Sequence, residues 1–280
     1  MPKENLKYGN ESISSLKGED RVRKRPAVIF GSDGIEGCEH SIFEILSNSI
    51  DEAREGFGNE ITVTRFLDNS IEIEDKGRGI PVDFNKNEKK FNWELVFCEL
   101  YAGGKYNNSS AEFYEYSLWL NGLGLCATQY ASEYMEVEIK RDGFKYNLNF
   151  EKGKNIGGLK KQPYSGKDTG SKIKWKPDLE VFTDIDVPLE NFEIMVKRQA
   201  IVNPNIKFTL KNQVQSGFES EVFLYENGIV DHVKELVGED SIIPVQFWQD
   251  EKMVRDRPDK PEYKTKINVA LTFSNKHSIA

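Results

Sequence analysis

Two pairs of alternating polar and apolar segments constrain this fold most, because each pair is typical of an antiparallel β-hairpin. Asp142-Gly143, between the strands of the second pair, is typical of a type I′ turn, and Asp68-Asn69 separates the strands of the first. The four strands are expected over residues 61–66, 70–75, 135–141 and 144–150. Two further strands are expected over 168–175 and 206–210. The chain therefore predicts a fold rich in hairpins.

A helix is expected over residues 41–53, with an apolar side and a polar side. The apolar side carries Ile42, Phe43, Leu46, Ile50 and Ala53, and the polar side carries Glu44, Ser47, Asn48 and Asp51. Glu44 and Asn48 are one turn apart, so they set a proton acceptor beside a neutral oxygen ligand, as nucleotide hydrolysis with a hard cation requires. Asp51 extends this row by a further turn. An ordinary amphipathic helix with a solvated outer side explains the same spacing.

A glycine-rich loop, Asp75-Lys-Gly-Arg-Gly-Ile-Pro81, follows the second expected strand. A carboxylate at the strand end can accept a hydrogen bond from the exocyclic amine of adenine. Gly77 and Gly79 permit positive φ and the close approach of a flat ligand. A glycine-rich turn that merely leaves a strand fits the same letters.

Two more glycine segments suit phosphate groups. Ala102-Gly-Gly-Lys-Tyr106 ends a short expected helix over 92–101, and residues 107–120 are predicted to form a mobile lid. Asn121-Gly-Leu-Gly-Leu125 opens an apolar helix, where backbone amides and the helix dipole favour anions. Neither a Walker A loop nor a Rossmann fingerprint is present.

Composition excludes several classes of protein. The chain has 280 residues, 38% of them hydrophobic, which is enough for a sizeable core, and its net charge of −8 argues against a nucleic-acid clamp. Cys38, Cys98 and Cys126 form no CxxC pair, so a disulfide framework and a zinc site are not expected. No long apolar run or signal peptide is evident, so we expect a cytoplasmic protein with no membrane partner.

The chain is expected to contain an arm and two domains. Residues 1–20 are polar with isolated apolar points and should form the arm, and 21–215 should form the first domain. Residues 216–280 change character and are expected to begin a second domain without completing it. The remaining expected helices span 189–202 and 229–237, and the remaining strands span 222–225, 242–248 and 266–273.

The motifs together resemble the GHKL (Bergerat-fold) ATPases, and among these the B subunits of bacterial type IIA topoisomerases, over residues 12–211. The shared motifs are Phe43-Glu44…Asn48…Asp51-Glu52, Asp75-x-Gly-x-Gly-Ile-Pro81, Ala102-Gly-Gly-Lys105, Asn121-Gly-x-Gly124 and Thr169-Gly-Ser171. The strings typical of the topoisomerase subfamily are Arg23-Lys-Arg-Pro26, Asp51-Glu-Ala53, Leu100-Tyr-Ala-Gly-Gly-Lys105 and Pro177-Asp-Leu-Glu-Val-Phe-Thr183. The resemblance implies an α+β sandwich, with helices on one face of a mixed, mostly antiparallel sheet, followed by the start of an α/β transducer domain.

The resemblance also implies a role for each matched residue. Glu44 would be the general base, and Asn48 would coordinate Mg²⁺ on the phosphates of ATP. Asp75 would bind the adenine amine, helped by a water near Gly79 and by Ser171. The other residues implied in nucleotide binding are Asp51, Gly77, Ile80, Lys105, Asn121, Gly122, Leu123 and Gly124. An outer pocket for coumarin-type inhibitors would be lined by Glu52, Arg78, Ile80, Pro81 and Arg141, with Arg78 paired to Glu52.

Three departures from the family pattern predict that nucleotide binding survives better than turnover. Leu118-Trp119 stands where a Gly-Gly pair is usual, Asn121 where His is common and Ser47 where Asp is common. In the family ATP closes two B subunits through the arm, so Tyr8 and Ile13 are expected dimer contacts. The topoisomerase A subunit and DNA would be bound only in the full complex, through parts outside this chain.

Two other functions remain open at this point. One is a nucleotide- or inhibitor-binding module that does not hydrolyse ATP. The other is a GHKL ATPase of the chaperone or mismatch-repair type. Glu44 favours an ATP-hydrolysing enzyme, because a pure binding module needs no base there.

Overall fold

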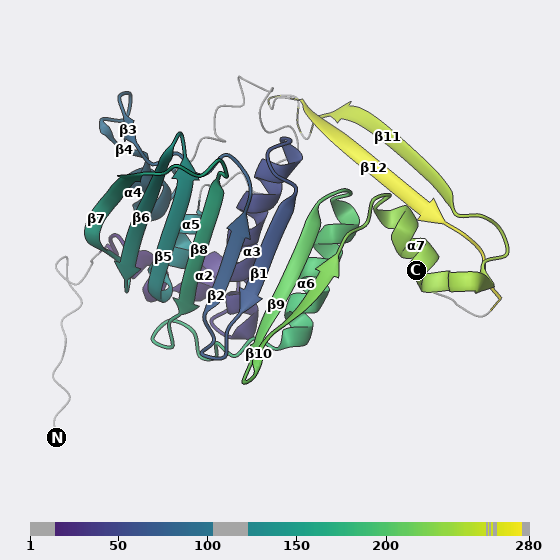
Figure 1. Ribbon diagram of the computed structural model, residues 1–280, viewed down its shortest axis with the longest axis horizontal. Helices are drawn as coiled ribbons and strands as arrows, with labels where there is room; N and C mark the ends of the chain where they lie inside the picture. The colour runs from purple at the N-terminus through teal and green to yellow at the C-terminus, as the bar shows by residue number, and fades with distance from the viewer. Residues whose placement is uncertain (1–14, 103–122, 256, 258, 260–261, 276–280) are drawn as a thin grey trace.

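One eight-stranded sheet organises the computed structural model, which describes residues 15–102, 123–255, 257, 259 and 262–275. Its strand order is β10-β9-β1-β2-β8-β5-β6-β7, seen face-on in Figure 1. The strands are β1 (Glu60–Arg65), β2 (Ile71–Asp75), β5 (Ser132–Arg141), β6 (Phe144–Glu151), β7 (Lys154–Pro163), β8 (Gly170–Pro177), β9 (Lys207–Val214) and β10 (Gly217–Phe223). All neighbours are antiparallel except β1 and β9, which are parallel. The expected mixed, mostly antiparallel sheet is confirmed.

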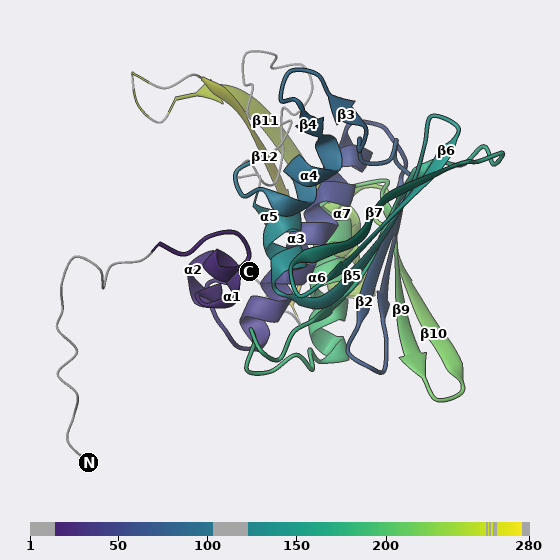
Figure 2. The same ribbon diagram turned by 90° about the vertical axis from the view of Figure 1, so that its left-hand side faces the viewer.

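Helices cover one face of this sheet, as Figure 2 shows. They are α1 (Asp20–Arg23), α2 (Pro26–Phe30), α3 (Ile35–Arg54), α4 (Asn92–Cys98), α5 (Gly124–Tyr130) and α6 (Leu189–Val202). Strand alternation explains the layering: Ile71 and Ile73 of β2 are buried, whereas Glu72 and Glu74 point away from the core. The α+β sandwich with helices on one face is confirmed.

Both predicted hairpins form. β1 pairs with β2 and β5 pairs with β6, each antiparallel. Asp142 and Gly143 have φ of 52° and 76°, as a type I′ turn requires. The helix expected over 92–101 ends earlier, at Cys98, and its N-cap is Phe91, whose backbone N–H donates to Glu94 Oε2 at 2.9 Å.

The part of the chain after β10 forms a second, smaller group of elements. It contains α7 (Ile229–Val237), a 3₁₀ turn η2 (Gly238–Asp240) and the hairpin of β11 (Gln246–Val254) with β12 (Tyr263–Leu271), at the right of Figure 1. A further small hairpin, β3 (Phe84–Asn85) with β4 (Lys90–Phe91), precedes α4. The strand expected over 222–225 in the second domain is instead β10, which pairs with β9. The first sheet therefore extends past residue 215, and the division of the chain into two domains stays a prediction.

Cys38, Cys98 and Cys126 are free, and burial raises the pKa of Cys38 and of Cys98 to about 12. No cluster of His, Cys, Asp and Glu within the described ranges could hold a metal ion. None of the described helices is long and apolar enough to cross a membrane.

Candidate nucleotide site

Three of the four residues on the polar side of α3 are buried and Asn48 is partly buried, which excludes an ordinary solvated outer side. Glu44, Ser47 and Asp51 are only 7%, 1% and 3% exposed. Burying carboxylates is costly unless they have partners, so their burial points to a defined local function. Asp51 interacts electrostatically with Arg54, near the end of the same helix.

Glu44 has a partner that the sequence interpretation missed. His40 lies one turn earlier on α3, and its Nε2 is 3.0 Å from Glu44 Oε1. A histidine in this position can orient the carboxylate through this contact. The signal available in the sequence was the i, i+4 spacing of a histidine and a glutamate on one predicted helix.

Asn48 is held by the backbone of its own helix. Its Nδ2 donates to the Glu44 carbonyl at 2.8 Å, so the amide turns its Oδ1 in the other direction. The Ser47 hydroxyl donates to the same carbonyl at 3.0 Å. An amide oxygen next to a buried carboxylate is a suitable ligand for a hard cation that also binds phosphates and water.

The start of α5 borders Glu44. A Cβ placed on Gly124 would lie 2.0 Å from Glu44 Oε2, so no side chain larger than that of glycine fits between them. The preceding residue, Leu123, is the N-cap of α5. Backbone amides at a helix start therefore lie beside the predicted base, as the phosphate assignment requires. Lys105, Asn121, Gly122 and Leu118-Trp119 lie outside the described residues.

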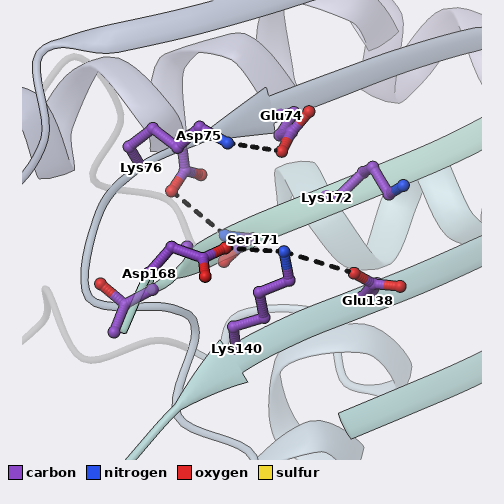
Figure 3. Close-up of a pocket in the computed structure, with 10 residues that line it drawn as sticks. Glu74, Asp75, Lys76, Glu138, Lys140, Asp168, Ser171 and Lys172 are labelled. Atoms are coloured by element: carbon purple, nitrogen blue, oxygen red, sulfur yellow. Dashed lines mark hydrogen bonds and ion pairs between the residues drawn. The ribbon is translucent and has the colours of Figure 1, made fainter. Parts of the chain in front are cut away.

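Asp75, at the end of β2, accepts three hydrogen bonds. Its Oδ1 accepts from the backbone N–H of Gly77 at 2.9 Å and of Ser171 at 3.2 Å, and its Oδ2 accepts from the Ser49 hydroxyl at 3.0 Å. Figure 3 shows the carboxylate directed at Ser171 on the neighbouring strand. Burial raises the pKa of Asp75, and the hydrogen bonds from Gly77, Ser171 and Ser49 oppose that rise. Ser49 was not among the predicted site residues, because the sequence showed it only as one residue of the expected helix.

The glycines of the loop allow close contact with strand β5 and with helix α3. Gly79 has φ of 80°, and a Cβ there would lie 2.7 Å from the Lys140 carbonyl. A Cβ on Gly77 would lie 2.4 Å from Glu52 Cγ. The Ile80 N–H donates to Ser171 Oγ at 3.1 Å, and the Thr169 hydroxyl donates to the Gly77 carbonyl at 2.6 Å. The Thr-Gly-Ser motif therefore fixes this loop.

The predicted pair of Arg78 and Glu52 is present. Arg78 donates from Nε to Glu52 Oε1 at 2.7 Å and from Nη2 to Oε2 at 2.9 Å. Burial raises the pKa of Glu52, but the hydrogen bonds and charge of Arg78 outweigh it, so the pKa is lowered overall. Arg141 Nη1 donates to the Gly79 carbonyl at 2.7 Å, and Pro81 is exposed beside this group.

Contacts made by α3 join Asp75, the glycine-rich loop and the start of α5. Ser49 connects α3 to Asp75, and Glu52 connects α3 to Arg78 in the loop. Gly124 connects the same helix to α5. Glu44, Asn48 and Asp75 thus belong to elements that contact one another along α3.

Known proteins resemble this chain over most of its length. The DNA gyrase B subunit of Thermotoga maritima is 36% identical over 230 residues, which are 82% of this chain and 35% of that relative. The DNA topoisomerase 4 B subunit of Staphylococcus aureus is 40% identical over 238 residues, covering 83% of this chain and 34% of that relative. The chain is homologous to type IIA topoisomerase B subunits. It spans about a third of the length of these relatives.

A solved structure supports the same relationship. The 43K ATPase domain of Thermus thermophilus gyrase B, in complex with an aminocoumarin, superposes with a TM-score of 0.70 at 30% identity. The superposition covers 84% of this chain and 59% of that one. No family model matches the sequence. The homology to gyrase and topoisomerase IV B subunits thus extends to the fold of their ATPase domain.

Proposed function

We propose that this chain is the ATP-binding and hydrolysing N-terminal region of a type IIA DNA topoisomerase B subunit. The observation that carries this proposal is Asp75, a partly buried carboxylate with three donors, held against the helix that bears Glu44 and Asn48. Residues after β10 would begin the transducer domain of such a subunit.

Adenine recognition follows from the hydrogen bonding of Asp75. A carboxylate offers about four acceptor positions, and three of them are used by Gly77, Ser171 and Ser49. The remaining position suits the exocyclic amine of adenine. Gly79 and Ser171 would bind the accompanying water, and Ile80 would pack against the base.

Hydrolysis would use Glu44 as the general base. It would take a proton from the water that attacks the γ-phosphate, while the contact from His40 holds the carboxylate in place. The amides of residues 121–124 and Lys105 would bind the phosphates. Asp51 would extend the row of polar residues that Glu44 and Asn48 form on α3.

The donor set fits a magnesium ion that arrives with ATP. Asn48 Oδ1 would be its protein ligand, with phosphate oxygens and water completing the shell. When bound, the ion neutralises negative charge on the phosphates.

In the complete protein this region would act as an ATP-operated dimerisation gate that drives DNA strand passage. The homodimer contact would come from the arm, including Tyr8 and Ile13, which lie outside the described residues. The topoisomerase A subunit and DNA would join through parts beyond this chain. Glu52, Arg78, Pro81 and Arg141 would line an outer pocket for inhibitors.

Paired nucleotide binding and hydrolysis measurements on Glu44→Ala test the proposal. We expect an ATP analogue to bind with unchanged affinity while ATP turnover disappears, since only the base is removed. The departures from the family pattern at Ser47, Leu118-Trp119 and Asn121 predict that turnover in the unaltered chain is weak. Glu36→Ala, an exposed substitution in the first turn of α3, is the matched control and should keep both properties. Turnover that persists at the same rate in Glu44→Ala would show that Glu44 is not the base. Nucleotide binding without any turnover in the unaltered chain would favour a module that binds nucleotide without hydrolysing it.

A further inference from the structure

Phe57 lies in a turn that follows α3 and is held against the glycine-rich loop. It stands between Gly56 and Gly58, whose φ angles are 85° and 77°. The Phe57 N–H donates to the Glu52 carbonyl at 3.2 Å. A Cβ on Gly58 would lie 2.5 Å from the Lys76 carbonyl, so the turn contacts the loop backbone directly. The backbone therefore holds the phenyl ring beside Arg78.

The guanidinium of Arg78 is fixed by two contacts of different geometry. Glu52 binds it edge-on through two hydrogen bonds, of 2.7 Å and 2.9 Å. The Phe57 ring lies against its face, with the guanidinium carbon 3.8 Å from the ring centroid. The two hydrogen bonds align the guanidinium with the plane of the Glu52 carboxylate. The Phe57 ring packs against one side of this plane and limits rotation of the Arg78–Glu52 pair as a unit. Arg78 still has 37% of its side chain exposed to an incoming ligand.

We propose that Phe57 is a positioning residue that sets the plane of Arg78 for stacking of a planar heteroaromatic ligand at the mouth of the site. This inference rests on the proposed function, because it assigns a ligand class to the outer pocket. A guanidinium held between two flat groups stacks on each of them. An aminocoumarin is a planar ligand of this kind, and the homologous Thermus thermophilus domain was solved with one.

Phe57 should act on planar outer-pocket ligands and not on the nucleotide. Adenine would be bound through Asp75, whose carboxylate is held by Gly77, Ser171 and Ser49. Loss of the phenyl ring therefore leaves the adenine contacts in place, while Arg78 can rotate away from its stacking plane.

Calorimetric titration of Phe57→Leu with an aminocoumarin and, separately, with a non-hydrolysable ATP analogue tests the proposal. We expect aminocoumarin affinity to fall about two- to fivefold and analogue affinity to stay unchanged. Phe57→Tyr should restore aminocoumarin affinity, because it keeps the aromatic face. Phe66→Leu is the matched control, since it removes a ring beneath Lys174 (4.1 Å) on the far face of the sheet.

Equal aminocoumarin affinity in the unaltered chain and Phe57→Leu would overturn the proposal. An equal loss for both ligands, or the same loss in Phe66→Leu, would also overturn it, because it would show general damage. If the unaltered chain failed to bind the ATP analogue, the proposed function would fail. The aminocoumarin comparison would still decide the role of Phe57, because it does not depend on the analogue.

Discussion

The sheet with its helices and the group formed by α7, β11 and β12 differ sharply in burial. Trp175 of β8 is fully buried, whereas Trp248 of β11 is 54% exposed. α7 contains no buried residue, and all but the last residue of β11 are exposed. Every described residue assigned to the nucleotide site lies in the first region. A site that must hold Asp75, Asn48 and Glu44 in fixed positions is thus built where packing prevents rearrangement.

Tryptophan substitutions test this difference most strongly. Trp175→Ala should lower the free energy of unfolding by about 3 to 5 kcal/mol, because it leaves a cavity in the core. Trp248→Ala should change it by less than about 0.5 kcal/mol. Denaturant unfolding, followed by circular dichroism, measures both. Similar losses would show that β11 is as firmly packed as β8.

Substitutions in ion pairs give a second test of the difference in burial, with a smaller expected change in the free energy of unfolding. Arg23 and Asp178 form a 2.6 Å pair with side chains only 13% and 6% exposed, and Arg23 also donates to the carbonyl of Tyr130 at the end of α5. Asp178→Asn should cost about 3 kcal/mol, because Arg23 stays buried beside a weaker partner. Glu262→Gln, which breaks the exposed pair with Arg255, should cost less than about 1 kcal/mol. A larger loss from Glu262→Gln in the same unfolding experiment would reverse the comparison.

Two buried serines on α3 test whether packing or a specific hydrogen bond supports the site. Ser49→Ala should weaken binding of an ATP analogue about fivefold, since Asp75 loses one of its donors. Ser47→Ala should have little effect on affinity, because its hydroxyl donates to the Glu44 carbonyl of its own helix. Equal losses in the two variants, measured by calorimetry, would show that packing of the helix matters more than the bond to Asp75.

The same pair of serines predicts a pH effect. The ionised Asp75 is the stronger acceptor for the adenine amine, so affinity should fall as pH drops through its pKa. Burial raises this pKa and the Ser49 hydroxyl lowers it, so Ser49→Ala should move the loss of affinity to higher pH. Titrations across the acid range measure this, and an unchanged pH profile would remove Ser49 from the account of Asp75.

Much of the fold could be predicted from local patterns. The Asp142-Gly143 turn with its alternating flanks indicated a hairpin, and the apolar periodicity of 189–202 indicated α6 with its observed bounds. The pairing of β10 with β9 was missed, because alternation says where a strand runs and not which sheet it joins.

The site was predictable where function depends on residue type along a short segment. The Glu52–Arg78 pair followed from the motif resemblance, and the structure contains it. Ser49 and Phe57 were missed, since each acts on a residue of the loop 75–78 that only the folded chain brings near. The roles of Glu44, Asn48 and Asp75 stay predictions.

The most direct test is calorimetric titration of a non-hydrolysable ATP analogue with Mg²⁺ into the unaltered chain and Asp75→Asn. The amide keeps the volume of the carboxylate, so the fold should persist. It also places a donor where adenine donates, so the hydrogen bond to adenine should be lost. We predict binding to the unaltered chain and affinity about ten- to hundredfold weaker in Asp75→Asn. Equal affinity in both proteins, or no binding to either, would contradict the assignment of this site to an adenine nucleotide.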